Sequence, residues 1–302
     1  MNYLDVEIFL TIAATKSITK AASILFLSQP TISHRLSALE QELSVPLFAR
    51  QKGHKTVQLT DKGEEFVPIA QRWISLMKET KGLKEHQDNY FVSLGCTDSL
   101  NIALLAPFYQ QQLQSNAPLD LRISTHHSAE LYGLIEGHEL DMAFVFHNLY
   151  YKNVIIEKFL QEKLYLMQAI PPLLPQRKVH PRNLIPEKEI FLSWDNNYDI
   201  WHDQWIPTLP RTHINVDTIA LALQLWHQKE MWMIAPASVV KYFCKLRPFF
   251  VSEIDNAPPD RICYKITHKA PNLTTGRSVK YLEEQLSTYL KNLDLSVKIG
   301  QS

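Results

Sequence analysis

Residues 17–41, SITKAASILFLSQPTISHRLSALEQ, decide the fold of the N-terminal part of the chain. Two apolar stripes within this stretch have the spacing of an α-helix. They comprise Ile18, Ala21, Ala22 and Leu25, and then Ile32, Leu36, Leu39 and Leu43, with Phe26 and Leu27 in the break between them. Ser28 is a suitable N-cap for the second helix, and Pro30 costs little in its first turn. This pattern predicts a helix-turn-helix of the kind that enters a DNA groove.

The polar face of the second predicted helix is the candidate reading surface. The first two turns of a recognition helix meet base edges, and an amide such as Gln29 can pair with a base or a phosphate. Arg35 lies nearer the buried edge, from which it could reach out along its stem. The alternative is an ordinary amphipathic helix pair with a solvated polar face. The candidates on this helix are Ser28, Gln29, Pro30, Thr31, Ser33, His34 and Arg35.

A small hairpin is predicted at residues 50–58, directly after the helices, with a basic tip at residues 51–55. A further helix, with Val6, Phe9, Leu10 and Ala13 on one face, is expected to precede the pair and pack across it. Three helices followed by a basic hairpin form a winged helix-turn-helix, whose wing places cations beside the phosphate backbone. The candidate DNA contacts of the wing are Arg50, Lys52, His54 and Lys55. A solvated turn without a DNA contact is the alternative.

A long helix is predicted from Thr60 or Asp61 to about Lys84, with a kink at Pro68. Its apolar stripe has no evident domain core beside it, so we expect it to pack against a copy of itself. Packing on the domain that follows is the alternative.

The composition is that of a globular protein with a local rather than a global basic surface. Thirty-one basic and thirty-one acidic residues cancel, and residues 1–62 hold seven basic and five acidic residues. Three distant cysteines without metal-ligand spacing are expected to be mostly buried thiols in a reducing compartment. No apolar run has the length of a membrane span, and no signal peptide is evident, so the expected location is the cytoplasm.

No catalytic motif is evident. The chain has no phosphate-binding glycine loop, nucleophile elbow, HExxH motif or paired cysteines, so we expect no enzyme activity, no cofactor and no metal. His126 and His127 are adjacent, but neighbouring side chains of an extended chain point to opposite faces, which disfavours joint metal ligation.

From residue 90 the pattern changes to alternating strands and helices, which predicts parallel sheets covered by helices on both faces. The expected strands are 91–96, 121–125, 142–146, 164–170, 190–193, 214–216, 231–235 and 261–267, and the expected helices are 100–114, 129–136, 218–228 and 275–292. The chain should cross between two α/β halves near residues 159–164 and again near 263–268, leaving a cleft. Ligands of open α/β sheets bind at the carboxyl ends of strands.

Polar and aromatic residues at these strand ends are the candidate ligand contacts. Residues 97–99 precede a predicted helix, where amides and hydroxyls can hold an anion or a polar group; simple capping of that helix by Asp98 or Ser99 is the alternative. Trp194 belongs to an expected aromatic-rich loop that could instead be packing. The candidates are Thr97, Asp98, Ser99, Thr125, His126, Phe146, His147, Trp194, Asn215, Asp217 and Thr218.

Ordered motifs carry a family resemblance over the N-terminal residues. They are residues 9–13, SITKAA at 17–22, LSQPTIS at 27–33, LEQEL at 39–43, VPLFAR at 45–50 and LTDKG at 59–63. In this order they resemble the LysR-type bacterial transcriptional regulators. Over residues 90–302 the resemblance is looser and rests on strand order and on ELDMA at 139–143.

The resemblance implies a winged helix-turn-helix at 1–60, a dimerising linker helix at 61–88 and a periplasmic-binding-protein-like effector domain at 89–302. The effector domain would divide into subdomain I, about 89–160 with 267–302, and subdomain II, about 161–266. The resemblance also implies that the 97–99 loop touches the effector, and that dimers commonly pair into tetramers on promoter DNA.

Two positions depart from the family pattern. His34 stands where the family usually has Arg, and a neutral His offers one donor and one acceptor instead of a bidentate pair to guanine. Residues 229–232, KEMW, replace a Gly-x-Gly turn, so Trp232 is expected to narrow or reshape the cleft.

The expected function is therefore that of a transcriptional regulator whose binding to double-stranded promoter DNA is modulated by a small-molecule effector. RNA polymerase is a further candidate partner. An α/β ligand-binding or enzymatic protein with an incidental helical N-terminus is the alternative. A third possibility is an effector domain that binds nothing and serves only assembly.

Overall fold

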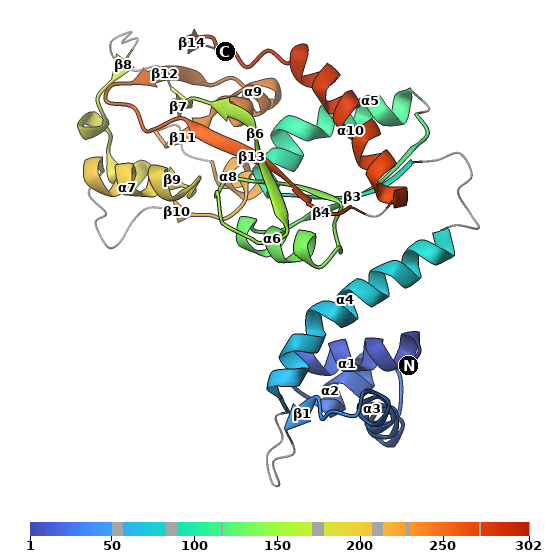
Figure 1. Cartoon of the computed structure of the whole chain (residues 1–302). Helices are drawn as coiled ribbons and strands as arrows, with labels where there is room; N and C mark the ends of the chain where they lie inside the picture. Colours follow the sequence, from blue (N-terminus) through green and yellow to red (C-terminus); the bar gives the residue numbers. More distant parts are fainter. Residues whose placement is uncertain are drawn as a thin grey trace. The chain divides into compact units, whose positions relative to one another are not determined.

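The computed structural model describes residues 1–49, 57–82, 90–115, 117–170, 178–206, 214–226, 230–271 and 273–301 (Figure 1). Contacts divide the chain into an N-terminal unit, described up to Gly82, and a C-terminal unit that begins at Tyr90. Within the described ranges, none of the helices combines the length and the apolar character needed to span a bilayer.

The N-terminal unit confirms the predicted helix-turn-helix. It contains α1 (Tyr3–Thr15), α2 (Ile18–Ile24), α3 (Gln29–Leu43), β1 (Phe48–Ala49), β2 (Gln58–Leu59) and α4 (Asp61–Gly82). The apolar stripes of α2 and α3 meet α1 in one core, where Phe9 packs against Phe48 and Phe66 with ring centroids 5.5 and 4.9 Å apart. The two alanines of α2, Ala21 and Ala22, are buried, so they permit close approach of the helices.

Local sequence sets the helix ends in this unit. Ser28 caps α3 as predicted, because its hydroxyl accepts from the amide of Thr31 at 3.2 Å. Asn2 and Asp5 form a reciprocal capping box at the start of α1. Strands β1 and β2 pair antiparallel, Phe48 with Leu59, and so form the base of the predicted hairpin. Its tip lies outside the described residues.

Helix α4 begins as predicted and runs through Pro68 without interruption. The hydroxyl of Thr60 accepts from the amide of Gly63 at 3.0 Å. A Cβ atom on Gly63 would lie 2.1 Å from the carbonyl oxygen of Leu47, so the backbone approach at this position requires glycine. The expectation that α4 has no core beside it is wrong for its first half, because Phe66 and Ala70 are buried in the N-terminal core.

The first half of the C-terminal unit is a five-stranded sheet with the order β4-β3-β5-β13-β6. Its elements are β3 (Tyr90–Cys96), the π-helical segment η1 (Leu100–Leu105), α5 (Ala106–Gln114), β4 (Leu119–Thr125), α6 (Ser128–Glu136), β5 (Met142–Val145), β6 (Val154–Glu162), β13 (Arg261–His268) and α10 (Leu273–Lys291). Strand β3 runs parallel to β4 and β5, as predicted, whereas β13 runs antiparallel to β5 and β6.

Alternating strand residues supply separate cores on the two faces of this sheet. Leu94, Cys96 and Phe144 pack with residues of α5 and α10 on one face. Ala143 and Val145 pack with α6 on the other face, which leaves α6 on the side opposite α10 (Figure 1).

The second half contains a mixed sheet with the order β11-β7-β12-β14, to which β8 adds beside β12. Its elements are β7 (Leu164–Gln168), β8 (Lys178–Val179), the 3-10 segments η2 (Pro181–Asn183) and η3 (Pro186–Lys188), β9 (Ile190–Phe191), α7 (Asn196–Trp205), β10 (Ile214–Asn215), α8 (Ile219–Leu225), β11 (Trp232–Pro236), α9 (Ala237–Leu246), β12 (Phe250–Ile254) and β14 (Gly300–Gln301).

The prediction of a parallel sheet is wrong for this half. Strand β7 lies antiparallel to both β11 and β12. The strand-helix-strand unit β11-α9-β12 does keep its two strands in one direction, but β7 occupies the place between them. The alternation of strand and helix patterns along the sequence therefore predicted the elements. It did not predict that β7 would lie between β11 and β12.

The chain passes between the two halves at different places from those expected. It crosses at Lys163, between β6 and β7, as predicted, but it returns between Ile254 and Arg261 rather than near 263–268. All eight residues of β13 pair with β6, so the strand belongs entirely to the first sheet. The chain then crosses a third time, because β14 pairs with β12. Residues 300–301 therefore belong to the second sheet and not to subdomain I.

Candidate nucleic-acid interface and effector site

Helix α3 presents its first two turns to solvent. Ser28, Gln29, Pro30, Thr31 and His34 are exposed, and Ser33 and Arg35 are half-buried. The opposite face of the helix is buried in the core of the N-terminal unit. The hydroxyls of Ser28 and Thr31 lie 2.7 Å apart, so the start of the helix carries a cluster of small polar groups. The structure thus places the predicted residues on one surface.

Arg35 has a protein partner. Its Nη1 atom donates to Oδ1 of Asp5 at 2.9 Å, and Oδ2 of Asp5 accepts from the amide of Asn2. Asp5 is largely buried, so the ion pair ties α3 to the start of α1. Sequence reasoning missed this role of Asp5. His34 and Arg35 line an open hollow of about 650 Å³ together with Asn2, Asp5, Pro30, Thr31 and Ala38.

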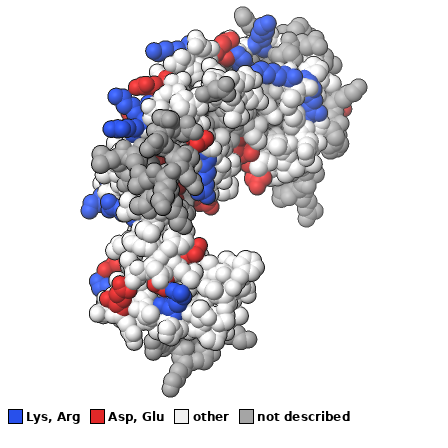
Figure 2. Space-filling model, turned by 90° about the vertical axis from the view of Figure 1, so that its right-hand side faces the viewer, with Lys and Arg blue, Asp and Glu red and all other residues white. Residues whose placement is uncertain are grey.

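The wing candidates Arg50, Lys52, His54 and Lys55 lie outside the described residues, so their predicted DNA contacts stay predictions. Over the described surface in Figure 2, Lys and Arg side chains are interspersed with Asp and Glu. This distribution agrees with the zero net charge of the chain.

In the C-terminal unit, several predicted ligand contacts gather at the carboxyl ends of β3, β4 and β5. Thr97 follows β3, His126 follows β4, and Phe146 and His147 follow β5. The amide of His126 donates to the carbonyl of Cys96 at 3.0 Å. The hydroxyl of Thr97 is buried and has no hydrogen-bond partner among the described residues. These ends therefore form one polar edge, as parallel strands predict.

Neighbouring groups hold some of the remaining candidates at this edge. The exposed Thr125 accepts at Oγ1 from Asn101 at 2.8 Å, and the carbonyl of His147 accepts from the Tyr132 hydroxyl at 2.7 Å. Nδ1 of His126 lies 3.4 Å from a carboxylate oxygen of Glu130. Among the described His, Cys, Asp and Glu residues, no three are placed to hold a metal ion together.

Asp98 does not cap the helix that follows it. Its Oδ2 atom accepts from the amide of Ile219, the first residue of α8 in the second half, at 2.9 Å. Thr218 caps the same helix by accepting from Leu221 at 3.4 Å. Ser99 precedes η1 without a capping bond from its side chain. Asn215 and Asp217 are exposed just before α8. The structure therefore brings the two predicted loops, 97–99 and 215–218, together.

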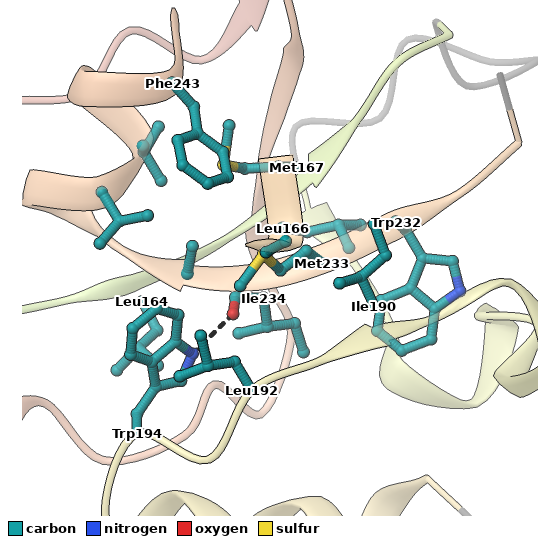
Figure 3. Packing of buried hydrophobic residues seen from close by; sticks show 14 of the residues in the cluster. Leu164, Leu166, Met167, Ile190, Leu192, Trp194, Trp232, Met233, Ile234 and Phe243 are labelled. Carbon is teal, nitrogen blue, oxygen red and sulfur yellow. Dashed lines mark hydrogen bonds between the residues drawn. The ribbon is translucent and has the colours of Figure 1, made fainter. Parts of the chain in front are cut away.

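Trp194 is a packing residue. Only 3% of it is exposed, and its indole Nε1 donates to the carbonyl of Ile234 at 2.7 Å (Figure 3). The prediction of an aromatic-rich loop is wrong, because residues 196–205 form α7, which Asp195 caps. Tyr198 and Trp201 are buried by this helix. The spacing of the aromatic residues in 196–205 did not distinguish this helix from a loop.

Trp232 also lies in a core. It is 2% exposed, and its Nε1 donates to the carbonyl of Ile185 at 2.7 Å. The indole belongs to the hydrophobic core of the second half, part of which Figure 3 shows. The expectation that it reshapes the cleft finds no support in this placement.

Arg261 is a second residue whose role sequence reasoning missed. It opens β13 and is 4% exposed. Its guanidinium carbon lies 3.3 Å from the ring centroid of Phe146, in the first half, and 4.9 Å from that of Trp194, in the second. Nη1 donates to the hydroxyl of Ser99 at 3.2 Å. The cation therefore lies between aromatic rings from the two halves, where cation-π attraction is favourable.

Glu162 is the buried counter-charge of Arg261 and its cross-strand partner in β6. The two charges are 4.0 Å apart, and the other carboxylate oxygen accepts from the amide of Ser238 at the start of α9. Burial raises the pKa of Glu162, against the opposing effect of Arg261. Burial lowers the pKa of Arg261 to about 10, and Glu162 opposes that change. Oε1 of Glu162 and Nε of Arg261 have no hydrogen-bond partner among the described residues, so the cost of burying these two charges is only partly offset.

Two of the three cysteines are buried, in line with the expectation of mostly buried thiols. Cys96 and Cys263 are buried, and burial raises the pKa of Cys96 to about 12 and raises that of Cys263 as well. A thiol is reactive as the thiolate. These two cysteines are therefore structural.

A helix-turn-helix followed by a long helix and by a two-sheet α/β unit with polar loops at its strand ends defines a DNA-binding regulator with a ligand-binding domain. The comparisons agree with this class. Residues 4–64 match the model for the bacterial regulatory helix-turn-helix protein, lysR family, and residues 87–275 match the LysR substrate binding domain. The chain belongs to the LysR family of transcriptional regulators.

Two curated relatives show the extent of the similarity. The HTH-type transcriptional regulator YofA of Bacillus velezensis is 30% identical over 83% of this chain and 86% of the relative. The HTH-type transcriptional regulator CitR of Bacillus subtilis is 27% identical over 67% of this chain and 70% of the relative. The chain is thus a regulator with a DNA-binding domain and an effector-binding domain.

Solved structures share the fold. Full-length OxyR C199D from Pseudomonas aeruginosa superposes with a TM-score of 0.64 at 20% identity, over 95% of this chain and 94% of that chain. The LysR family regulator CbnR gives a TM-score of 0.61 at 17% identity, over 95% and 99% of the two chains.

Proposed function

We propose that the exposed N-terminal face of α3 reads promoter DNA, and that a small-molecule effector bound at the junction of the two effector subdomains modulates this binding. The observation that carries the first part is the separation of the two faces of α3. Ser28, Gln29, Thr31 and His34 face solvent, whereas Ile32, Leu36 and Leu39 are buried. Hydroxyl, amide and imidazole groups can all pair with base edges.

The proposed effector site comprises the loops 97–99 and 215–218 with the strand ends beside them. Asp98, Ser99 and Thr218 already form hydrogen bonds at this junction, and the buried hydroxyl of Thr97 is a candidate for bonding to a ligand. A ligand that binds one arrangement of the halves more tightly shifts the population toward it. Rotation of the two halves would then change the distance between the N-terminal DNA-binding domains of the proposed dimer.

Helix α4 is the proposed dimer contact. Ile69 and Leu76, seven residues apart on one helix face, are 60% and 42% exposed. Seven-residue spacing suits packing of two such helices along their length. Pairing of these dimers into tetramers, a cytoplasmic location and a contact with RNA polymerase belong to the same proposal, which involves no catalysed reaction.

Footprinting of full-length protein on the DNA upstream of its own gene tests the DNA-binding part. We expect a protected site at physiological salt that changes in extent or affinity with one effector. Thermal shift with a metabolite library tests the effector part, since a ligand that binds only the folded state raises its melting temperature. Absence of any shift would favour an effector domain that serves only assembly.

A further inference from the structure

The turn between α2 and α3 has a left-handed residue at its centre. Helix α2 ends at Ile24, with Leu25 as its C-cap. The amide of Leu27 donates to the carbonyl of Ala22 at 3.0 Å, and the amide of Phe26 donates to that of Ser23 at 3.4 Å. This pair of bonds is the Schellman arrangement, which requires a positive φ at the residue after the C-cap. Phe26 has φ 53°.

A bulky side chain at that position is costly. Glycine usually occupies it, and asparagine is the next choice, because other side chains crowd the backbone in the left-handed region. Among the described residues, the other non-glycine residues with positive φ are all polar: Lys16, Ser44, His138 and Asn256. Phe26 is the apolar exception.

The ring of Phe26 contributes little to the core. It is 95% exposed, more than any other large apolar side chain in the described ranges. Its neighbour Leu27 is half-buried and packs on the N-terminal core. Leu27 therefore contributes to packing, whereas Phe26 combines an unfavourable backbone conformation with an exposed apolar ring. Strain of this kind tends to persist where it serves a function.

Phe26 is continuous with the proposed reading face. Ser28 caps α3 two residues later, and Gln29, Pro30 and Thr31 are exposed beside it. In helix-turn-helix proteins the second helix enters the major groove while the first crosses the backbone. The turn that joins them must then lie at the edge of the groove, next to the sugars and phosphates.

We propose that Phe26 is a DNA-contact residue, whose ring packs on deoxyribose carbons of the backbone at the edge of the groove that α3 enters. The proposal rests on the proposed DNA-binding face. An apolar ring releases no counterions, so its contribution to affinity should be independent of salt, unlike that of a cation. Sugars carry no sequence information, so the contribution should be equal for all sequences.

Variants F26N, F26A and F26Y of the full-length protein test this contact on a labelled duplex that carries the footprinted site. F26N should melt about 2–8 °C above wild type, because asparagine tolerates the left-handed backbone. It should nevertheless bind DNA about three- to tenfold more weakly. F26A should lose the same affinity without the gain in stability, and F26Y should bind like wild type.

Several readouts separate this contact from other roles. The loss should be the same on a scrambled duplex, and the slope of affinity against salt should stay unchanged. L113A, at an 81% exposed position in the effector domain, is the matched control and should bind as wild type does. Unchanged affinity of folded F26N and F26A would overturn the proposal, as would a change in oligomeric state that accounts for the loss. If wild type itself binds no DNA, the proposed function fails first.

Discussion

The carboxylate of Asp98 in the first half of the effector domain accepts a hydrogen bond from the amide of Ile219 in the second half at 2.9 Å. Ile219 begins α8, and a carboxylate at a helix N-terminus is favoured by the helix dipole. The bond therefore couples the position of the 97–99 loop to that of a helix 121 residues away in the sequence. Contacts of this kind can differ between two arrangements of the halves.

Replacement of Asp98 by alanine should loosen both sides of this contact. We expect D98A to lower the free energy of unfolding of the effector domain by about 0.5–2 kcal/mol, the usual effect of removing a helix cap. Hydrogen exchange should become faster in η1 and in α8. T218A, which removes the local cap of α8, should speed exchange in α8 alone. Unchanged exchange in α8 of D98A would contradict the coupling.

Glu162 should make stability depend on pH in an unusual direction. Burial raises its pKa in the folded state above the value of the unfolded chain. The folded state therefore takes up a proton first, and stability at this site rises as pH falls through the folded pKa toward the unfolded one.

The variant E162Q cannot take up this proton. The free energy of unfolding of wild type minus that of E162Q should therefore increase as the pH falls toward the ordinary pKa of a glutamate, as measured by urea denaturation. E284Q, at an exposed position of α10, serves as the control for general effects of charge. Parallel pH profiles for wild type and E162Q would show that burial does not govern this carboxyl.

Two glycine substitutions should have opposite effects. G63A should destabilise the N-terminal unit by about 1–3 kcal/mol, because its Cβ would collide with the carbonyl oxygen of Leu47 at 2.1 Å. G133A in α6 should stabilise its helix by about 0.5–1 kcal/mol, since nothing lies within 4 Å of the added atom. Thermal denaturation compares the two, and a stable G63A would argue against the close approach at α4.

Charged residues on the exposed face of α4 should prevent assembly. We expect the double variant I69D/L76D to raise the dimer dissociation constant about 100-fold or more. Two apolar side chains that the proposed dimer would bury are then replaced by unpaired charges. Sedimentation velocity over a range of concentrations measures this change. L113D, at an exposed position of α5, is the control for surface charge. A dimer that survives both α4 substitutions would place the interface elsewhere.

The helices of the N-terminal unit and their ends could be predicted, because the signals that set them are local. Apolar spacing, the cap at Ser28 and the motif around Thr60 each act within a few residues, and the structure confirms the helices and the base of the hairpin. Phe26 marks the limit of this reasoning. The break was predicted, but its left-handed backbone and outward ring depend on the three-dimensional turn.

The effector domain was predicted less well, because its decisive contacts join distant residues. Arg261 meets Glu162 only because β13 pairs with β6, and no pattern of neighbouring residues predicts that pairing. The polar strand ends could be predicted from strand order, whereas the partner of Asp98 could not. For Trp194 the sequence left both a pocket wall and packing open, because composition does not distinguish a core from a cavity.

The most direct test of the central claim, that α3 reads promoter sequence, is competition binding of full-length wild type and H34A to the footprinted duplex and to a scrambled duplex. His34 is exposed at the centre of this face. We predict that wild type prefers its site at physiological salt and that H34A weakens specific binding by about 1–3 kcal/mol while binding to the scrambled duplex stays unchanged. Equal affinity of wild type for the two duplexes would contradict the claim.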